Sequence, residues 1–339
     1  MKAIVLTKIG AAVKAFEIRE LPIPEISENE VLIRVAFSGL NFADVMARIG
    51  MYKEAPPLPS VLGYDVSGKI EAAGDNVKNF SPGDLVFAFT RFGGYAQYVK
   101  CNAMAVAKIP SDIDMASATA LATQFSTAHF CAAEMVNLHE GDSVLIHAAA
   151  GGVGTALTQY ALHKKCIVFA TAGSDEKINM LLKAGVHVAI NYRKEKFENV
   201  VRQKTNGKGV NVILDAVGGK SVKLGIKSLS AGGRIVCYGA AEMTSRGSLF
   251  HYLKTGIAFG FYNPGLLTTA AKSIIGINML RISDERPELM KRSMDEVCKL
   301  AEEGIFKPVL GNVFPVSDIA TAHVFLESRA SVGKVVVEW

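Results

Sequence analysis

The residues of this chain best suited to chemistry are three closely spaced glycines, Gly151, Gly152 and Gly154. They follow the largely apolar run Ser143–His147 and precede helical spacing over Val153–His163. In a strand–turn–helix unit, the first glycine makes the tight turn, the second lets backbone N–H groups approach a pyrophosphate, and the third lets helix and sheet pack closely. We expect a dinucleotide site, although an ordinary strand–turn–helix connection can carry the same glycines.

Short apolar strand patterns and helical patterns alternate after the glycine motif. The predicted strands are Cys166–Thr171, His187–Asn191, Val210–Asp215 and Gly233–Gly239. Between the first two, Asp175–Ala184 has helical spacing, and Gly185 suits the position just beyond its end. This alternation predicts a parallel sheet buried on both faces. We expect Asp215 to order the loop after its strand rather than to act as an acid or base.

Residues 1–123 have a different sequence pattern, in which short runs typical of β-strands are separated by turns rich in proline and glycine. The runs are Lys2–Thr7, Val31–Phe37, Ser67–Ala72, Leu85–Phe89 and Gly94–Val99. This pattern predicts an irregular β-barrel or sandwich. Further along, helices are predicted from about Asp114, over Pro287–Glu303 and over Ile319–Glu327. A last strand, Lys334–Glu338, could return to the first domain.

Composition narrows the class of protein. The 339 residues are 50% hydrophobic and 20% charged, which suffices for about two domains with sizeable cores. The net charge of +5 is dispersed without a long Lys or Arg run, so no nucleic-acid partner is expected. Five scattered cysteines form no CxxC pair, which fits a reducing compartment. We see no signal peptide or membrane span, and expect a cytoplasmic protein.

Four stretches resemble the medium-chain dehydrogenase/reductase superfamily, and within it the zinc-free quinone oxidoreductases. They are Ser38–Asp44, His147–Gly154, Leu214–Gly219 and Ser328–Lys334. The phrase Asn41–Tyr52 is most similar to the vesicle amine transport protein homologue branch. One departure is Ala148, where many members carry glycine. We expect the methyl group of Ala148 to be tolerated, because the later glycines make the turn and let the backbone approach the phosphate.

The resemblance covers essentially the whole chain and implies an α/β protein. Residues 1–123 would form a GroES-like, β-rich catalytic domain. Residues 124–282 would form an NADP-binding Rossmann domain with a doubly wound parallel sheet. Residues 283–339 would form a C-terminal segment that returns to the catalytic domain.

The resemblance also argues against a catalytic metal. The zinc ligands of related alcohol dehydrogenases fall at Asn41, Tyr64 and about Thr123, and none of these supplies a thiolate or an imidazole. Zinc needs about four N, S or O ligands at close range. Three other residues could donate, although turn, surface or core roles account for them: Asp44, Asp65 and His129. We therefore expect no metal.

The end of the second Rossmann strand favours a phosphorylated ribose. No carboxylate stands at its tip, where Gly173 and Ser174 follow. Asp175 and Glu176 come next, but acids are favoured in the first turn of a helix. A hydroxyl, a small loop and cations suit a 2′-phosphate. The resemblance places its contacts at Gly173, Ser174, Lys177 and Tyr192, which predicts NADPH. The alternative is that the cations here, including Arg193, are solvated surface charges.

The remaining site residues come from the resemblance. The expected cofactor contacts are Asn41, Thr127, Ala150, Gly151, Gly152, Val153, Gly154, Gly173, Ser174, Lys177, Tyr192, Tyr238 and Gly239. The expected catalytic residues are Asn41, Tyr52 and Tyr64. The carboxamide of Asn41 could bond a carbonyl, or form only an Asx turn. Tyr52 could orient or protonate the substrate, although tyrosine, with a pKa near ~10, is a poor acid. Packing is the alternative for Tyr52, and Tyr64 could line the cleft.

These expectations point to reduction of an electron-poor acceptor. Stabilising an alkoxide without a metal is difficult, whereas a quinone or an α,β-unsaturated carbonyl accepts hydride and leaves a stabilised anion. We expect an NADPH-dependent, zinc-free oxidoreductase that reduces small hydrophobic acceptors by direct hydride transfer. The alternatives are an enoyl-thioester reductase and a non-catalytic NADPH-binding protein associated with lipids or vesicles.

The segment 255–271 is unusually apolar and is interrupted by glycine and proline. It could be a lid over a hydrophobic substrate, a patch that touches membranes, or a helix at a subunit contact. A strand predicted over Ile274–Met279 would then pair two Rossmann sheets in a homodimer. An unpaired apolar edge would be an aggregation hazard, which favours this pairing.

Overall fold

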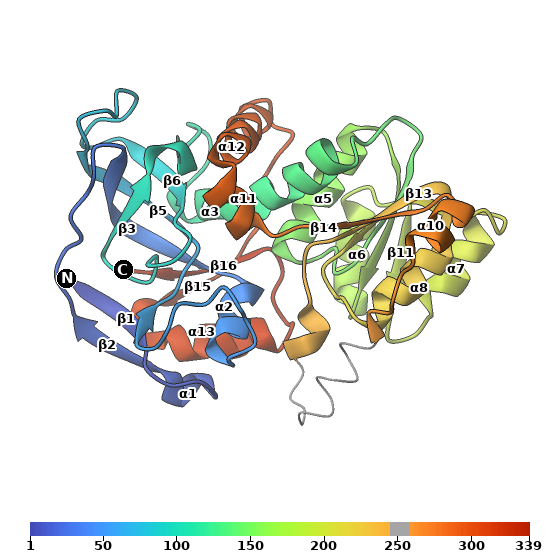
Figure 1. Cartoon of the computed structure of the whole chain (residues 1–339), viewed down its shortest axis with the longest axis horizontal. Helices are drawn as coiled ribbons and strands as arrows, with labels where there is room; N and C mark the ends of the chain where they lie inside the picture. The colour runs from blue at the N-terminus through green and yellow to red at the C-terminus, as the bar shows by residue number, and fades with distance from the viewer. Residues whose placement is uncertain (245–257) are drawn as a thin grey trace. The chain divides into compact units, whose positions relative to one another are not determined.

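The computed structural model describes residues 1–244 and 258–339. The chain divides into two compact units, whose elements are labelled in Figure 1. Unit 1 consists of Met1–Ser126 and Met279–Trp339, and unit 2 of Thr127–Asn278. The predicted domain boundaries, after residues 123 and 282, lie within a few residues of the boundaries between these units.

Unit 2 contains a six-stranded sheet whose neighbouring strands are all parallel. Its strands are β9 (Ser143–Ile146), β10 (Ile167–Ala172), β11 (Val188–Asn191), β12 (Val210–Asp215), β13 (Leu229–Cys237) and β14 (Ser273–Gly276). The order β11-β10-β9-β12-β13-β14 is that of a doubly wound sheet, which reverses between β9 and β12. The predicted Rossmann sheet is confirmed. In such sheets, ligands bind beyond the carboxyl ends of the strands at the reversal.

Helices connect these strands (Figure 1). Those described in unit 2 are α5 (Gly152–His163), α6 (Asp175–Lys183), α7 (Phe197–Lys204), α8 (Lys220–Ser228) and α10 (Pro264–Ala270), with shorter turns η3 (Phe130–Met135) and η4 (Ala241–Thr244). Helix α4 (Ser126–His129) lies at the boundary of the units. The predicted helix end at Gly185 is confirmed, because its φ of 95° lies in the region that favours glycine.

The packing of side chains inside unit 2 explains why its strands are apolar runs in the sequence. Leu145, Phe169 and Ile213 pack together with Val222 of α8 and Ile235 in one buried cluster. These side chains come from neighbouring strands and from a covering helix. A parallel sheet covered on both faces buries successive residues of each strand, so its strands lack the alternation of a half-exposed sheet.

Unit 1 is rich in β-structure. Its strands are β1 (Lys2–Leu6), β2 (Phe16–Glu20), β3 (Glu30–Leu40), β4 (Ser60–Val61), β5 (Asp65–Ala73), β6 (Leu85–Phe89), β7 (Tyr98–Asn102), β8 (Val106–Lys108), β15 (Leu310–Pro315) and β16 (Lys334–Glu338). Three of them form the sheet β2-β1-β4. The other seven form the order β15-β16-β3-β5-β6-β8, with β7 also paired to β3.

Helices complete unit 1. They are α1 (Ala12–Ala15), α2 (Phe42–Arg48), η1 (Ala103–Ala105), α3 (Met115–Ala120), η2 (Leu121–Phe125), α11 (Met279–Glu285), α12 (Pro287–Glu302), η5 (Val316–Asp318) and α13 (Ile319–Glu327). The two predicted C-terminal helices are thus confirmed as α12 and α13. Pro287 occupies the first turn of α12, where its missing N–H leaves no helical bond unmade.

Two predicted strands are displaced. The strand expected over Gly94–Val99 begins only at Tyr98, and the residues before it make only an isolated bridge, Ala3 to Ala96. A φ of 86° at Gly93 bends the chain just ahead of this stretch. The strand expected over Ile274–Met279 lies at Ser273–Gly276 instead, because Met279 starts α11.

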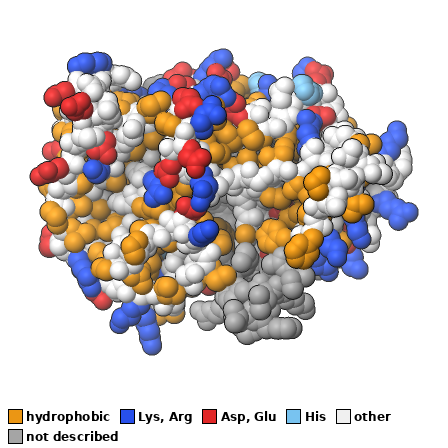
Figure 2. Space-filling view, in the orientation of Figure 1, with side chains coloured by type: hydrophobic (Ala, Val, Ile, Leu, Met, Phe, Trp, Pro, Cys, Tyr) orange, Lys and Arg blue, Asp and Glu red, His pale blue; other side chains and the backbone are white. Residues whose placement is uncertain are grey.

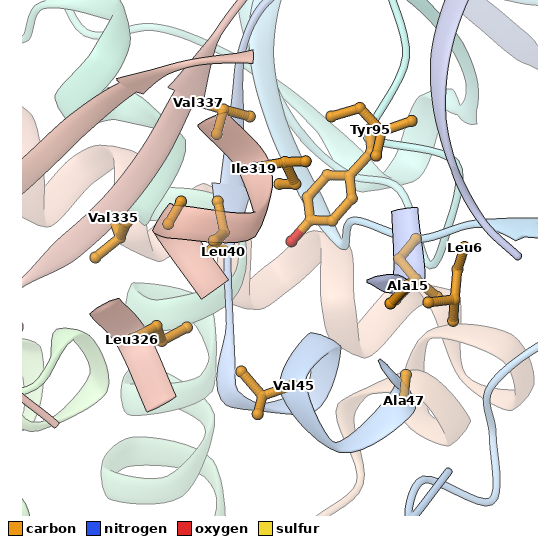
Figure 3. Close-up of a cluster of buried hydrophobic side chains, with 13 residues drawn as sticks. Leu6, Ala15, Leu40, Val45, Ala47, Tyr95, Ile319, Leu326, Val335 and Val337 are labelled. Atoms are coloured by element: carbon orange, nitrogen blue, oxygen red, sulfur yellow. The ribbon is translucent and has the colours of Figure 1, made fainter. Parts of the chain in front are cut away.

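The predicted return of the last strand to the first domain is confirmed. Strand β16 pairs antiparallel with β3, with Val335 opposite Leu40. Figure 3 shows these two side chains in one buried cluster with Val45 of α2 and Leu326 of α13. The two ends of the sequence therefore share one core.

On the face drawn in Figure 2, hydrophobic side chains are scattered among polar and charged ones. Residues 255–257 of the apolar segment lie outside the described residues. In its described part, Phe261 is 91% exposed and Leu266 is 70% exposed, and α10 buries none of its residues. Strand β14 is outermost in the sheet order. Within residues 1–244 and 258–339, no helix is both long and apolar enough to span a membrane.

Candidate functional site

The turn after β9 differs from the prediction. Gly151 was expected to make the tight turn, but it is extended, with φ −78° and ψ 173°. The left-handed residue is Ala148, with φ 54°. The N–H of His147 bonds the carbonyl of Leu214, and that of Ala149 bonds the carbonyl of Thr171, so the chain must turn between them. The methyl group of Ala148 is tolerated because this residue is exposed.

The close packing expected at Gly154 is confirmed, whereas the approach of a pyrophosphate at Gly152 stays a prediction. Gly151 caps α5, and Gly152 and Val153 start its first turn, where N–H groups lack helical partners. A Cβ on Gly154 would overlap the backbone of Ala148 and Ala149, so only glycine allows this helix to pack so closely. Such an N-terminus suits an anion. Ala150, by contrast, is buried just before the helix.

Beyond β10, a small loop lies under an aromatic ring. The ring and hydroxyl of Tyr192 lie against Gly173, where they leave no room for a Cβ. Ser174 caps α6, and its hydroxyl oxygen accepts the N–H of Lys177 at 3.4 Å. The structure therefore brings together all four residues that were expected to contact a 2′-phosphate.

Two cations lie near this loop, and the carboxylate of Glu176 interacts with the hydroxyl of Ser174. Burial lowers the pKa of Lys177, and the charge of neighbouring Arg193 lowers it further. Asp175 follows the loop, but its two oxygens accept from Nζ of Lys194 at 2.6 Å and from Nδ2 of Asn191 at 2.9 Å. Two like charges held close together favour a bound anion, and an engaged carboxylate is a poor partner for ribose hydroxyls.

At the ends of β12 and β13, backbone groups rather than side chains are placed to contact a cofactor. Asp215 accepts the N–H groups of Val217 at 2.6 Å and Gly218 at 2.8 Å, which confirms that it orders its loop. The hydroxyl of Tyr238 is buried and has no hydrogen-bond partner among the described residues. A Cβ on Gly239 would press on the carbonyl of Ala216. The predicted contacts of Tyr238 and Gly239 would therefore be made by their main chain.

The last cofactor residue predicted in unit 2 is Thr127, which is buried in α4. Near the glycine motif, His147 was not predicted as a site residue. Its Nδ1 lies 3.1 Å from the hydroxyl of Thr171, and its Nε2 finds no partner in the described part of the chain. It is almost fully buried, and burial lowers its pKa, so it is a neutral core residue beneath the turn.

In unit 1, Asn41 lies between β3 and α2 as the N-cap of the helix. Its backbone N–H donates to Asp44 at 2.9 Å. Its side chain points elsewhere: Nδ2 donates to Asp65 at 3.0 Å, and Oδ1 accepts from Lys334 at 3.2 Å. These two contacts orient the side chain, and the contact with a carbonyl that the sequence suggested stays a prediction. Asn41 as a whole is half-buried.

Asp44 is a buried carboxyl group close to Asn41. Its second oxygen accepts the N–H of Gly63 at 3.1 Å. Burial raises its pKa to about 7, with a further increase from Asp65, while the two backbone donors and Lys334 act in the opposite direction. Asp44 therefore holds the turn at the start of α2 and binds its proton far more readily than an exposed aspartate.

Tyr52 and Tyr64 lie together, as expected for residues that line one site. Their rings meet edge to face with centroids 6.2 Å apart, and Phe92 lies 5.1 Å beyond Tyr64. Burial raises the pKa of Tyr52 to about 12 and that of Tyr64 further still. Both therefore keep their protons at neutral pH. The hydroxyl of Tyr64 is buried without a partner among the described residues.

One pair in this unit, Asp65 and Lys334, was not predicted from the sequence. Nζ of Lys334 lies 2.5 Å from Asp65, and both side chains are fully buried. A lysine at the head of the apolar run Val335–Val337 was the one available signal. In the parts of the chain that the structure describes, no group of three or more His, Cys, Asp or Glu could hold a metal ion.

Two family models match this chain, one within unit 1 and one that runs from unit 2 into the C-terminal part of unit 1. Residues 27–111 match the alcohol dehydrogenase GroES-like domain, and residues 184–337 match the zinc-binding dehydrogenase family. The expected GroES-like fold of the N-terminal part is therefore confirmed.

Full-length relatives are similar along nearly the whole chain. Quinone oxidoreductase of Rattus norvegicus is 30% identical over 97% of this chain and 98% of its own length. The synaptic vesicle membrane protein VAT-1 homolog of Danio rerio is 32% identical over 99% of this chain and 69% of its own length.

Two solved structures resemble the whole fold. Escherichia coli quinone oxidoreductase complexed with NADPH has a TM-score of 0.87 and 27% identity, and each chain is covered completely. CurK enoyl reductase has a TM-score of 0.86 and 26% identity, over 99% of this chain and 98% of its own.

Proposed function

The chain belongs to the quinone oxidoreductase family of the medium-chain dehydrogenase/reductases, and from this we propose that it is an NADPH-dependent, zinc-free reductase. Its acceptor is a small hydrophobic quinone or an α,β-unsaturated carbonyl. The observation that carries the cofactor is the loop Gly173–Ser174, beside which Lys177 and Arg193 stand and the nearest following acid, Asp175, is engaged. This arrangement suits a 2′-phosphate.

The residues present fit the rest of the cofactor. The N–H groups of Gly152 and Val153 in the first turn of α5 would hold the pyrophosphate, and the missing side chain of Gly151 would allow its close approach. The backbone of Tyr238 and Gly239 and the buried Thr127 line the remainder of the dinucleotide. When bound, NADPH supplies a hydride to the acceptor.

In this proposal, unit 1 binds and orients the acceptor. Asn41 offers an N–H to its carbonyl oxygen, where negative charge develops during reduction. Tyr52 and Tyr64 provide aromatic surface and hydrogen bonds. Burial raises the pKa of Tyr52 to about 12 and that of Tyr64 further still, so both hydroxyls are protonated at neutral pH. The proton that completes the reaction comes from water or from a nearby hydroxyl.

The assay that tests this proposal follows NADPH oxidation by EDTA-treated protein with a panel of quinones and enones, with NADH in parallel. Turnover that prefers NADPH and survives EDTA supports the proposal. Turnover only after added Zn²⁺ would overturn the zinc-free assignment. Tight NADPH binding without turnover on any acceptor would favour a non-catalytic, vesicle-associated protein instead.

The similarity to CurK enoyl reductase favours one second candidate, an enoyl-thioester reductase. Its substrate would share the polarised C=C–C=O unit of an enone, so the same orientation of Asn41 would serve it. Crotonyl-CoA in the same assay distinguishes the two. A kcat/KM for crotonyl-CoA well above that for every quinone and simple enone would favour the second candidate.

We further propose that the protein is a cytoplasmic homodimer in which β14 of one copy pairs with β14 of the other. The supporting observation is that β14 is the outermost strand and carries partly exposed Ile274 and Ile275. Pairing would satisfy the open edge. A monomeric mass by light scattering at micromolar concentration would contradict the dimer, and cell fractionation tests the location.

A further inference from the structure

Three polar side chains from distant parts of the sequence meet inside unit 1. Nζ of Lys334 lies 2.5 Å from one oxygen of Asp65 and 3.2 Å from Oδ1 of Asn41. The other oxygen of Asp65 accepts from Nδ2 of Asn41 at 3.0 Å. Each side chain thus contacts the other two in a closed ring of hydrogen bonds.

Strand pairing brings this ring together. Strand β16 runs antiparallel to β3 with Val335 opposite Leu40, so Lys334, the first residue of β16, comes beside Asn41, the residue that follows β3. Figure 3 shows Leu40 and Val335 in the cluster beside this point. Asp65 begins β5, which pairs with the other side of β3. The three residues therefore converge where β3 ends.

Gly39 leaves the space that this ring of hydrogen bonds among Asn41, Asp65 and Lys334 occupies. A Cβ at this position would collide with the carboxylate of Asp65 and with the end of the Lys334 side chain. A glycine in the middle of a strand usually weakens the strand, but it allows close approach of neighbouring groups. Here the close neighbours are the ion pair itself.

We propose that Asp65 and Lys334 are positioning residues that hold the carboxamide of Asn41 with its second Nδ2–H facing the acceptor carbonyl. This inference rests on the proposed function, because it assigns the pair a role at that same site. The pair does not touch the acceptor in this assignment. It acts only through Asn41.

The ring permits only one orientation of the amide. A carboxamide has two N–H donors and one carbonyl oxygen. With Oδ1 on Lys334 and Nδ2 on Asp65, each end meets a group of opposite character. A flipped amide would place its N–H groups against an ammonium and its oxygen against a carboxylate. One N–H is used by Asp65, so the second N–H of the amide is the donor that we assign to the ligand.

Stability alone does not account for this pair. Removing two charges from water is unfavourable, and apolar residues of similar volume often replace a buried ion pair without loss of stability. Such residues would not distinguish the two ends of an amide. The oriented amide is therefore what this pair provides and an apolar pair would not.

The test compares the double variant D65L/K334M with wild type. Both charges are removed together, because either one left alone would be buried without its partner. The matched control is V337A, which removes core volume from the same strand, two positions beyond Val335 on the opposite face from Lys334. The double variant D65N/K334Q serves as the second comparison if the first does not fold, because it removes the charges but keeps polar side chains.

The first readout is independent of turnover. The side-chain N–H signals of Asn41 are assigned by comparison with N41S, and their hydrogen exchange is measured. We expect one strongly protected Nδ2 proton in wild type and V337A, and at least about tenfold faster exchange in the pair variants. Equal protection in all of these proteins would overturn the proposal, whether or not any of them turns over.

The second readout separates orientation from folding. We expect the pair variants to lose about tenfold or more in kcat with the preferred acceptor, while the Kd for NADPH stays within about twofold of wild type. If a pair variant folds and its Asn41 amide exchanges faster than in wild type, but its kcat is unchanged, the proposal is also overturned. If wild type and V337A both fail with every acceptor, the proposed function fails, and the exchange measurement still decides whether the pair orients Asn41.

Discussion

The aromatic ring of Tyr192 lies against Gly173, so closely that no Cβ could be accommodated there. Tyr192 follows β11 and Gly173 follows β10, two neighbouring strands of the parallel sheet. Their contact fixes a short backbone segment at the carboxyl edge of the sheet. Lys177 and Arg193, one from each connection, stand beside it. This relationship makes the loop a candidate phosphate site.

Lys177 should select NADPH over NADH. A charge-assisted hydrogen bond contributes about 1.5–3 kcal/mol, and partial exposure of this side chain places the expected loss at the lower end. We expect K177A to raise the Kd for NADPH about tenfold and to leave the Kd for NADH nearly unchanged. Fluorescence titration of both nucleotides measures this change.

The control for that experiment is K183A, on the same helix but near its far end, where the side chain is exposed. It removes the same charge from the protein without changing the loop. Equal weakening of NADPH binding by K183A and K177A would indicate general electrostatic attraction. Unchanged nucleotide preference in K177A would refute the assignment of the loop.

Gly154 and Gly151 should differ sharply when each is replaced by alanine. At Gly154 a Cβ would overlap the backbone of Ala148 and Ala149, whereas at Gly151 the nearest atom would be 3.3 Å away, with φ at −78°. We expect G154A to lower the free energy of unfolding by about 2–3 kcal/mol, and G151A by less than about 1 kcal/mol. Urea unfolding without nucleotide measures both, and similar losses would contradict the close packing of α5.

Much of unit 2 could be predicted from the sequence because its strands are buried on both faces. Runs such as Val210–Asp215 are apolar without alternation, and a helix pattern separates each from the next. Such a pattern depends only on the residues of the strand itself and not on contacts with distant residues. Even Asp215 could be interpreted correctly, because an acid after a buried strand and before two glycines has few roles besides ordering its loop.

The features that could not be predicted depend on contacts between distant residues. Lys334 and Asp65 are 269 positions apart in the sequence, and each alone is typical of a surface. Their pairing requires β16 to lie beside β3, so the side chain of Asn41 could not be placed without it. The turn at Ala148 was missed for another reason. Glycine is so strongly associated with positive φ that Gly151, three residues further on, was assigned the turn.

Replacing Ala148 by glycine should stabilise the protein. Ala148 adopts φ 54°, a left-handed conformation that costs an L-residue roughly 1–2 kcal/mol. Glycine avoids this strain but gains freedom in the unfolded chain, so we expect A148G to add about 0.5–1 kcal/mol. The control is A149G, at a fully buried position outside the left-handed region, which should lose stability. A decrease in the unfolding midpoint of A148G would show that the methyl group is stabilising.

A buried histidine should make unit 1 sensitive to acid. His323 is fully buried, its ring lies 4.7 Å from that of Phe16, and its Nε2 lies 3.4 Å from the hydroxyl of Tyr95. Burial, together with the nearby charge of Arg48, lowers its pKa from 6.5 to about 3. Arg48 itself pairs with Glu327 at 2.6 Å. The folded protein therefore holds His323 neutral over a range of pH in which the unfolded chain protonates it.

The sign of the effect follows from this difference. Above pH 6.5 both states are neutral and the group contributes nothing, whereas between pH 6.5 and about 3 the unfolded chain binds the extra proton. Stability should fall by up to ~1.4 kcal/mol per pH unit in this window. Asp44, whose pKa is raised to about 7, acts in the opposite direction, because the folded state takes up its proton as the pH falls. The raw stability profile of wild type therefore mixes the two groups.

Comparison of wild type with H323Q isolates the histidine, since Asp44 is present in both proteins. Glutamine can still bond the hydroxyl of Tyr95 but does not titrate. We expect the difference in the free energy of unfolding to be constant above about pH 7 and to shift in favour of H323Q by ~1 kcal/mol or more between pH 6 and pH 5. Urea unfolding at each pH measures this difference. Parallel profiles for the two proteins would mean that His323 gains its proton in the folded state as readily as in the unfolded chain, and that its burial does not control acid stability.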